Sequence, residues 1–446
     1  MCFRECPAEL FPELRSNEDT ARGYVYSNTN LANREVCPPC LGACPLGQQV
    51  RDYVQLLNVG KVKEALLVIR QDNPLPGVCG YVCHHPCEQA CIRGSWDDPV
   101  SIRELKRYAA HYEMDHRNEI VEVLIQRKEP ARGKKVVIVG AGPAGLACGF
   151  ELAMRGYAVT VMDALAQPGG MLRAGIPSFR LPRRVIDHDI GIIISLGVTF
   201  MNSVCIGKDI ALDTLCSQGA DAVVVAVGAH RATSLGIPGE GGEGYTEWHS
   251  FLEQTNMGKG VEIQGKVLVV GGGNAAIDVA RCALRAGARG VEVLSIERED
   301  EMPADPSEVK TAKREGIHLS FQVVPIAVVK ANGRVTGLTC APARLGWDEL
   351  GRRIPIRMEG ELLTVKGDFV ISATGQRSEL SFLKAESISE RETIDVVKMG
   401  RIRGYHRVFG AGDAVTGPST VVDAIASGQA TARHVINYLE RSGNQR

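Results

Sequence analysis

Residues 134–164, KKVVIVGAGPAGLACGFELAMRGYAVTVMDA, decide the fold class of this chain. An apolar run leads into Gly140, Gly142 and Gly145, and a helical segment follows them. Glycines in this G-x-G-x-x-G pattern allow a tight turn and a close approach of the backbone to a pyrophosphate at the helix N-terminus. Asp163 ends the next apolar run, 23 residues after Gly140, where an acid can bond a ribose hydroxyl. The stretch therefore predicts a dinucleotide site on a βαβ unit.

A second fingerprint, KVLVVGGGNAAIDVARCALRAGARGVEVLSIERE at 266–299, repeats this pattern. Alanine in its third glycine position still permits close packing of the helix on the strand. Glu297 ends the following apolar run, at the position of the ribose-binding acid. Two such sites predict two dinucleotides, a bound flavin and an exchanging nicotinamide. The cofactor contacts expected in this second turn are Gly271, Gly273, Asn274, Ala275 and Ala276.

Composition excludes several function classes. The 446 residues carry a formal net charge of −1, with 44% hydrophobic and 23% charged residues, which suits an α/β protein. This balance gives no broad attraction to nucleic acid or to anionic membranes, so we expect neither partner. No apolar run reaches the roughly 18 residues of a membrane span, and charged residues near the N-terminus argue against a signal peptide. We therefore expect a cytoplasmic protein, whose thiols stay reduced.

Nine of the 14 cysteines fall within the first 91 residues, a segment that otherwise has a helical pattern. CPPCLGACP holds Cys37, Cys40 and Cys44, and GVCGYVCHHPCEQACIRG at 77–94 holds four more at a constant spacing of four. Reduced thiols argue against disulfides and leave a zinc site or an iron–sulfur cluster. Ferredoxin-type runs end in Cys-Pro, as this first run does, which favours a [4Fe–4S] site. Its predicted ligands are Cys44, Cys83, Cys87 and Cys91.

The C-terminal stretch GAGDAVTGPSTVVDAIASGQ, 410–429, resembles the second FAD motif of flavoprotein reductases with two dinucleotide domains. In those proteins an aspartate bonds the ribityl or phosphate part of FAD, which implies this role for Asp413, next to Gly412. A helix predicted to begin near Thr420 would direct its positive N-terminal end at the flavin.

Several motifs in one order resemble the glutamate synthase small-subunit family, which includes the NADPH:ferredoxin bifurcating large subunit and the N-terminal part of dihydropyrimidine dehydrogenase. Beside the C-terminal stretch, they are CPPCLGACPLGQQVRDYVQLL, NPLPGVCGYVCHHPCEQACIRG, GGMLRAGIPSFRLP, GGGNAAIDVARCALRAGA and EMPA. The resemblance implies that one further segment passes close to the flavin. Its matching residues are Gly170, Gly175, Ile176, Pro177 and Arg180.

The resemblance also implies the domain organisation. We expect an α/β protein with two Rossmann-like dinucleotide-binding domains, one inserted in the other, preceded by an α-helical iron–sulfur domain. We assign residues 1–130 to the helical domain, 131–245 and 365–446 to the FAD-binding domain, and 246–364 to the NAD(P)H-binding domain. The charged stretch QRKEPARGKK, 126–135, is the predicted linker.

The cysteine pattern departs from the family. Members with two N-terminal clusters usually carry C-x2-C-x4-C-x3-C-P, and here its first two cysteines fall on Ala32 and Glu35. Cys37 and Cys40 are therefore additional candidate ligands. One [4Fe–4S] cluster is expected, and a second stays open.

The nicotinamide site departs as well. NADPH-using members carry Tyr-Arg-Arg where this chain has Ser295, Ile296 and Glu297. A carboxylate repels a 2′-phosphate but can bond a free 2′-hydroxyl, so we predict NADH. In the alternative interpretation, Glu297 is a solvated surface acid and Arg298 binds the phosphate of NADPH.

The predicted function is that of a diaphorase subunit, which passes electrons between NADH or NADPH and a partner redox protein through FAD and a [4Fe–4S] cluster. The chain ends soon after the FAD helix, so we expect a separate catalytic or electron-carrier subunit in a hetero-oligomer. The alternatives are a stand-alone reductase of ferredoxin, sulfur or a small acceptor, the glutamate synthase small subunit itself, and a zinc-stabilised flavoprotein. We predict no catalytic side chain, because hydride transfer between stacked rings needs positioning more than acid–base groups.

Overall fold

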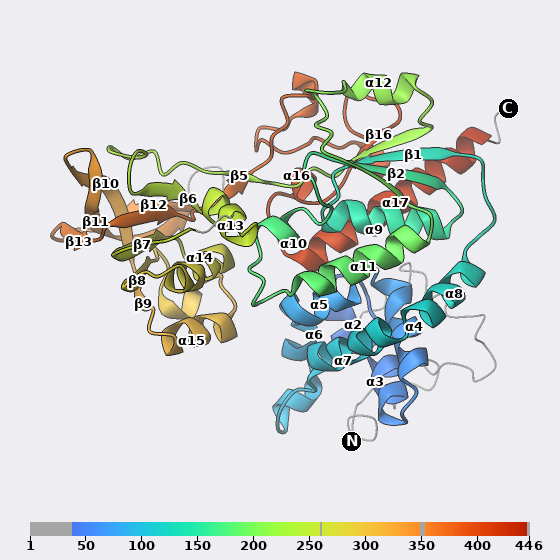
Figure 1. Cartoon of the computed structure of the whole chain (residues 1–446), viewed down its shortest axis with the longest axis horizontal. Helices are drawn as coiled ribbons and strands as arrows, with labels where there is room; N and C mark the ends of the chain where they lie inside the picture. The colour runs from blue at the N-terminus through green and yellow to red at the C-terminus, as the bar shows by residue number, and fades with distance from the viewer. Residues whose placement is uncertain (1–37, 259–260, 348–352, 444–446) are drawn as a thin grey trace. The chain divides into compact units, whose positions relative to one another are not determined.

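The computed structural model describes residues 38–258, 261–347 and 353–443 (Figure 1). The chain divides into two compact units. The first takes the described residues up to Gly170, Arg180–Gly228 and those from Leu380 on; the second takes Met171–Phe179 and Ala229–Glu379. The predicted inserted domain, 246–364, lies within this second unit.

The first unit contains a five-stranded parallel sheet in the order β16-β4-β1-β2-β3. β1 is central, with β2 on one side and β4 on the other, so its C-terminal end lies at the switch point where dinucleotides bind in such sheets. The strands are β1 Lys135–Val139, β2 Ala158–Asp163, β3 Thr199–Asn202, β4 Ala222–Val225 and β16 Val408–Gly410. The helices of this part are α9 Pro143–Met154, α11 Arg183–Ser195, α12 Leu212–Ser217, α16 Asp413–Thr416 and α17 Val421–Gly443, with 3-10 turns η6 Ala385–Ser387 and η7 Lys398–Gly400.

Short helices precede this sheet in the same unit. They are α2 Pro39–Ala43, α3 Val50–Asn58, α4 Val62–Asp72, α5 Pro76–Val82, α6 Pro86–Gln89, α7 Ile102–Asp115 and α8 Arg117–Arg127, with the 3-10 turn η4 Ile92–Ser95. Proline at the first helical position starts α5 and α6, where its missing N–H would have no partner. The residue before α6, His85, has a left-handed backbone with φ 43°, which turns the chain sharply between the two helices.

Buried charges join these helices to the sheet region. The Arg70 guanidinium of α4 donates to Glu113 of α7, with Nε to Oε1 at 2.9 Å, and to Asp189 of α11, with Nη2 to Oδ1 at 3.0 Å. All three side chains are at most 1% exposed. The same Asp189 accepts the backbone N–H of Val78 at the start of α5, at 2.9 Å. The helical segment and the first sheet therefore form one packed body.

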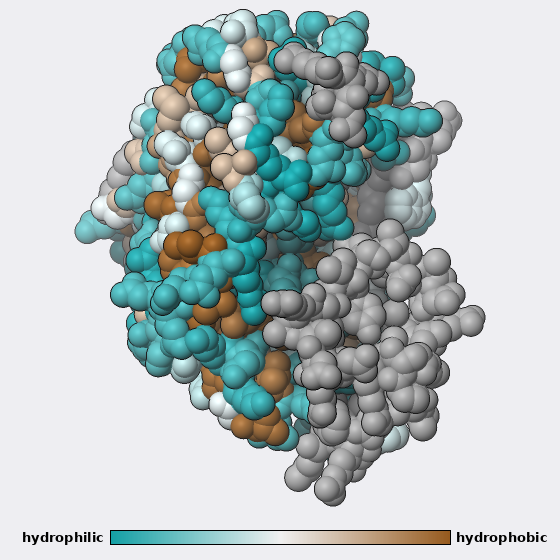
Figure 2. Space-filling view, turned by 90° about the vertical axis from the view of Figure 1, so that its right-hand side faces the viewer, coloured by the Kyte–Doolittle hydropathy of each residue, from teal (hydrophilic) through white to brown (hydrophobic). Residues whose placement is uncertain are grey.

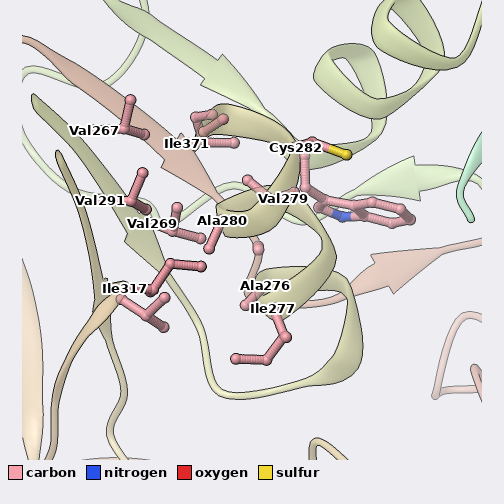
Figure 3. Close-up of a cluster of buried hydrophobic side chains, with 14 of the residues drawn as sticks. Val267, Val269, Ala276, Ile277, Val279, Ala280, Cys282, Val291, Ile317 and Ile371 are labelled. Atoms are coloured by element: carbon pink, nitrogen blue, oxygen red, sulfur yellow. The ribbon is translucent and has the colours of Figure 1, made fainter. Parts of the chain in front are cut away.

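The second unit is built on a parallel sheet in the order β6-β14-β7-β8-β9. Its strands are β6 Tyr245–Glu247, β7 Lys266–Val270, β8 Gly290–Leu294, β9 His318–Ser320 and β14 Phe369–Ser372. Its helices are α10 Met171–Ala174, α13 Trp248–Asn256, α14 Asn274–Arg285 and α15 Pro306–Arg314, with η5 Glu299–Glu301. Figure 3 shows apolar side chains of α14 packed with those of the strands.

The second unit also carries an antiparallel layer that the sequence analysis did not predict. β11 Arg334–Trp347 pairs with β10 Val323–Ala331 and, on its other side, with β12 Arg353–Arg357 and β13 Leu363–Lys366. A two-stranded ribbon of β5 Arg231–Ala232 and β15 Gln376–Arg377 lies where the chain enters and leaves this unit. The apolar runs of the two fingerprints form β1 and β2 in the first unit and β7 and β8 in the second.

The described residues form no candidate membrane-spanning helix. None of their helices has the length and apolar character needed to cross a membrane. On the face shown in Figure 2, hydrophobic side chains gather in small patches that hydrophilic side chains separate.

Candidate functional site

The first glycine turn leaves room only for glycine at two of its three positions. A Cβ at Gly145 would lie 1.9 Å from the Gly140 carbonyl oxygen, and one at Gly140 would lie 2.3 Å from the Ala226 oxygen. Gly140 also has φ +107°, which side chains disfavour. At Gly142 no described atom lies within 4 Å of a Cβ position, just before α9 begins. The turn therefore offers open backbone at a helix N-terminus, as pyrophosphate binding requires.

The Asp163 side chain, at the end of β2, accepts hydrogen bonds that hold this turn. Its Oδ2 accepts the Ala141 N–H at 2.6 Å, and its Oδ1 accepts the Leu165 N–H at 2.7 Å. The side chain is buried. The carboxylate therefore fixes the turn, and its contact with a ribose hydroxyl stays a prediction.

The C-terminal motif lies against the same turn. Gly412, with φ +68°, would place a Cβ 2.7 Å from the Ala144 Cβ, and a Cβ at Gly428 of α17 would lie 2.1 Å from the Ala144 oxygen. The Gly412 N–H donates to Ser427 Oγ at 2.8 Å, which fixes the loop to α17. A Cβ at Gly170 would in turn lie 2.9 Å from the Gly142 Cα. Segments far apart in sequence thus converge on the first glycine turn.

Asp413 has an unused acceptor at this point. Its Oδ1 is buried and has no hydrogen-bond partner in the described part of the chain, although the Ser419 backbone N–H bonds the carboxylate. Burial raises the pKa of Asp413 to about 6 against that bond. A buried oxygen of this kind costs free energy unless a donor meets it, and the hydroxyl groups of a bound flavin nucleotide would supply donors. The residues at this site therefore fit FAD.

The helix after this loop is capped by its own side chains. Thr420 Oγ1 accepts the Asp423 N–H at 3.2 Å and donates to Asp423 Oδ2 at 2.6 Å, immediately before α17 begins at Val421. Both hydrogen bonds use the hydroxyl of Thr420, a predicted site residue, so this hydroxyl fixes the start of α17.

The segment predicted to pass near the flavin is divided between the two units. Gly170 and Arg180 belong to the first unit, whereas Gly175, Ile176 and Pro177 belong to the second. In the second unit the N–H groups of Gly175 and Ile176 both donate to the Met171 oxygen and so end α10. The chain therefore passes between the units on each side of Met171–Phe179.

The second glycine turn has the same construction. A Cβ at Gly271, φ +140°, would lie 2.3 Å from the Ala373 oxygen, whereas at Gly273 no described atom lies within 4 Å. The buried side chain of Ala276 fills the third glycine position, and Ala275 packs at the edge of the core. Asn274 Oδ1 accepts the Asp305 N–H at 2.9 Å, which anchors the loop after EMPA to the turn. This arrangement fits a second dinucleotide.

Glu297 lies over the second turn. A Cβ at Gly272 would meet Glu297 Oε2 at 2.3 Å and Ser295 Oγ at 2.6 Å, so this middle glycine gives the carboxylate its space. The Ser295 hydroxyl donates to the same Oε2 at 2.7 Å and orients it. Arg298, in contrast, is exposed and forms a two-bond ion pair with Asp300, at 3.0 and 2.7 Å.

The predicted cluster cysteines come from four short elements of the first unit. Cys40 lies in α2, Cys44 ends it, Cys83 ends α5, Cys87 lies in α6 and Cys91 precedes η4. α2 packs on α6, which brings the two cysteine runs together. Cys37 lies outside the described residues.

The local chemistry of these thiols fits an iron–sulfur cluster. Within the described ranges, no three His, Cys, Asp or Glu side chains converge as closely as the ligands of a single metal ion do. Cysteine thiolates are the ligands that a [4Fe–4S] cluster takes. Burial raises the pKa of the Cys83 thiol, and that of Cys87 to about 12, against the nearby charge of Lys106. Metal binding would release these protons.

Comparison with known families decides the class. Residues 134–428 match the pyridine nucleotide-disulphide oxidoreductase family, which covers more than half of the chain. The chain belongs to this family of oxidoreductases. Residues 21–118 match a second family, the dihydropyrimidine dehydrogenase domain II with a 4Fe-4S cluster.

Two curated relatives are similar in sequence to this chain over about nine tenths of its length. The NADP(+)-dependent formate dehydrogenase subunit beta of Moorella thermoacetica is 39% identical over 91% of this chain, which spans 60% of that protein's length. The glutamate synthase [NADPH] small chain of Escherichia coli is 33% identical over 90% of this chain and 89% of its own length. These matches confirm the predicted glutamate synthase small-subunit-like family.

Solved structures agree on the fold alone. FprA of Mycobacterium tuberculosis, in complex with NADPH, superimposes with a TM-score of 0.60 at 20% identity, over 70% of this chain and 86% of its own. Together with the family matches, this confirms the predicted fold of two dinucleotide-binding domains with a helical iron–sulfur region. Its cofactors are FAD, NAD(P) and a [4Fe–4S] cluster.

The sequence analysis missed several residues of these sites. Gly272 stands within a visible run of three glycines, and only the nearby carboxylate explains why the middle one is needed. Ser427, which holds the Gly412 loop, gives no signal because serine is common in helices near their start. The surroundings of the cysteines include Tyr53 and Lys106, which in sequence look like ordinary residues of amphipathic helices.

Proposed function

We propose that this chain is the electron-input subunit of a larger enzyme, oxidising NADH and delivering electrons singly to a partner redox protein. The observation that carries the proposal is that the FAD turn and the cluster cysteines belong to one packed unit. α17 begins at the FAD loop, and its Gln429 Nε2 donates to the Asp72 oxygen of α4 at 2.9 Å. The same body that holds the flavin therefore holds the helices of the iron–sulfur site.

The protein's own groups have three tasks in this proposal. Bound FAD supplies the chemistry that converts a two-electron hydride donor into single electrons for a cluster. The glycine turns hold the two pyrophosphates, Asp413 accepts from the flavin nucleotide, and the cysteine thiolates hold the iron. No described side chain needs to move a proton, because positioning alone serves hydride transfer between stacked rings.

The nicotinamide is NADH in this proposal. Glu297 would accept a hydrogen bond from the free 2′-hydroxyl of NADH and repel the 2′-phosphate of NADPH. Arg298 is already paired with Asp300, which weakens the alternative interpretation. The names of both relatives specify NADP(+) or NADPH, so NADPH is the competing assignment.

Nucleotide choice is tested by steady-state reduction of a dye with each nucleotide. We expect the wild type to favour NADH in kcat/KM, Glu297→Gln to lose about tenfold with NADH, and the control Arg298→Ala to change little. A wild type that favours NADPH and loses this preference in Arg298→Ala would establish the competing assignment.

The cluster in this proposal takes Cys44, Cys83 and Cys87, with the fourth ligand from Cys91 or Cys40. Cys91 fits the predicted set, whereas Cys40 lies in α2, which packs on α6 and ends at Cys44. Iron content of the Cys40→Ser and Cys91→Ser variants distinguishes the two. The variant that loses the cluster identifies the ligand, and loss in both would point to a second cluster.

The partner is tested by anaerobic purification from the native host, followed by NADH titration under visible and EPR spectroscopy. We expect a co-purifying catalytic or carrier subunit and an iron–sulfur EPR signal that NADH induces. A lone protein that turns over with ferredoxin or a small acceptor would replace the proposal with the stand-alone reductase. A protein with flavin and zinc but no iron would refute it.

A further inference from the structure

A buried tyrosine hydroxyl near the cysteines lacks a partner. The Tyr53 side chain of α3 has no solvent exposure, and its hydroxyl has no hydrogen-bond partner among the residues that the structure describes. Buried tyrosine hydroxyls normally find one, because an unsatisfied buried donor costs free energy. The geometry therefore calls for an acceptor that a bound group would supply.

The surroundings of this hydroxyl identify the acceptor. α3 packs on α4 and on α7. α7 in turn packs on α5, which the buried Cys83 ends, and on α6, which contains the buried Cys87. Burial, and after it the charges of four cysteines, raises the pKa of Tyr53 well above its ordinary value; they are Cys87, Cys44, Cys40 and Cys83. The hydroxyl thus lies within electrostatic reach of both cysteine runs.

Lys106 of α7 is a second polar group at the same place. Its side chain is only 5% exposed. One turn earlier on α7, the Arg103 guanidinium donates to the Cys83 carbonyl oxygen at 3.2 Å. α5 and α7 approach closely, since a Cβ at Gly80 would lie 2.9 Å from the Arg107 Cα. The helix therefore holds Lys106 against the cysteines.

We propose that Tyr53 and Lys106 raise the reduction potential of the cluster, Tyr53 by donating its O–H to a cluster or cysteine sulfur and Lys106 by its positive charge. The inference rests on the cluster site of the proposed function and assigns it two tuning residues. One-electron reduction makes the cluster more negative, and a donor or a cation beside it stabilises the reduced form more than the oxidised form. Both residues would thus favour electron transfer from the flavin to the cluster.

The test is an EPR-monitored redox titration of the full-length holoprotein. Tyr53→Phe removes only the hydroxyl, and we expect about a tenfold lower ratio of reduced to oxidised cluster at a fixed potential, about 59 mV for a one-electron couple. The matched control is Tyr81→Phe in the same domain, whose hydroxyl bonds His111 Nε2 at 2.9 Å. Lys106→Met should lower the potential as well.

Each outcome decides the inference. A cluster signal of wild-type shape and iron content, with a potential lowered in Tyr53→Phe and Lys106→Met but not in Tyr81→Phe, supports it. Equal potentials in Tyr53→Phe and Tyr81→Phe overturn it, and so does loss of iron on removal of this one oxygen, which would give Tyr53 a structural role. A wild type without any iron–sulfur signal would instead refute the proposed function itself.

Discussion

Two glycines of the first turn differ in whether the structure has space for an added Cβ atom. At Gly145 it would collide with the Gly140 oxygen, so Gly145→Ala should destabilise the fold of the first unit and prevent FAD retention. At Gly142 the space is open and the backbone is extended, so Gly142→Ala should fold normally and lose FAD. Flavin absorbance per chain and the thermal midpoint of the apoprotein measure the two effects. Equal midpoints for both variants would contradict this account.

A second residue-scale prediction concerns pH. Burial raises the pKa of Asp72 from 3.8 to about 7, against a bond from the Gln49 backbone and the charge of Arg433. Because the folded-state pKa lies above the unfolded one, the resulting stability is complete below about pH 4 and is lost as pH rises toward 7. Asp72→Asn should remove this loss, a change on the order of a few kcal/mol.

Thermal midpoints at about pH 5.5 and about pH 8.5 measure this effect. The wild type should lose more between these values than Asp72→Asn does, whereas the exposed control Asp98→Asn should follow the wild type. Parallel curves for all three proteins would show that Asp72 is not the group responsible.

Residues whose role depends on a local backbone turn could be predicted from the sequence. Residues whose role depends on neighbours from distant segments could not. The spacing of Gly140, Gly142 and Gly145 is local, because the turn that requires them is formed by the same residues. Tyr53 and Lys106 gain their importance from helices that meet only in the folded chain, and neither carries a motif. Glu297 lies between these cases, since its position was predictable but the space that Gly272 gives it was not.

At the scale of elements, the buried charges of α4, α7 and α11 connect the iron–sulfur helices to the flavin domain. Arg70 and His188 hold the pKa of Glu113 below its ordinary value although burial opposes them, whereas burial raises that of Asp189 to about 6. Arg70→Met would remove the guanidinium that pairs with both buried carboxylates, at a cost of about 3–5 kcal/mol. Chemical denaturation followed by flavin release measures this loss.

The matched control is the exposed pair of Lys63 and Glu119, which joins α4 to α8. Lys63→Met should change stability little, because exposed ion pairs contribute little. If Arg70→Met were as mild as Lys63→Met, the buried cluster would not be what joins the two regions.

Elements with a strong local pattern were predictable, and those that depend on their partners were not. β1, β4 and β7 are β-branched runs that end in glycine turns, the pattern of buried parallel strands. β10 and β11 are joined by Asn332-Gly333, a two-residue turn with positive φ at both positions, which is a local hairpin signal that the sequence analysis did not use. β11 also pairs with β12 and β13, which no local turn predicts. Cross-strand pairing of this kind is not visible along a single segment.

For the whole molecule, loss of the cluster should separate electron input from electron output. Cys83→Ser should still allow NADH to reduce the flavin, since the nucleotide sites do not include the cysteines, but should abolish reduction of the partner. Stopped-flow flavin absorbance and partner reduction measure the two steps. The control Cys340→Ala, a buried cysteine of the second unit, should retain both. Loss of flavin reduction in Cys83→Ser would contradict separate steps.

The two-segment construction of the second unit limits how this protein can be re-engineered or recombined. Asn256 Nδ2 donates to the Ala174 oxygen at 2.8 Å, and the Phe179 ring lies beneath the Arg281 and Arg285 guanidinium groups, at 4.7 and 4.1 Å. A contiguous cassette of residues 229–379 would leave these partners behind and expose the face that they cover. A chimera designed to exchange coenzyme preference therefore needs Met171–Phe179 from the same donor protein as residues 229–379. Replacing one continuous segment would not transfer the specificity.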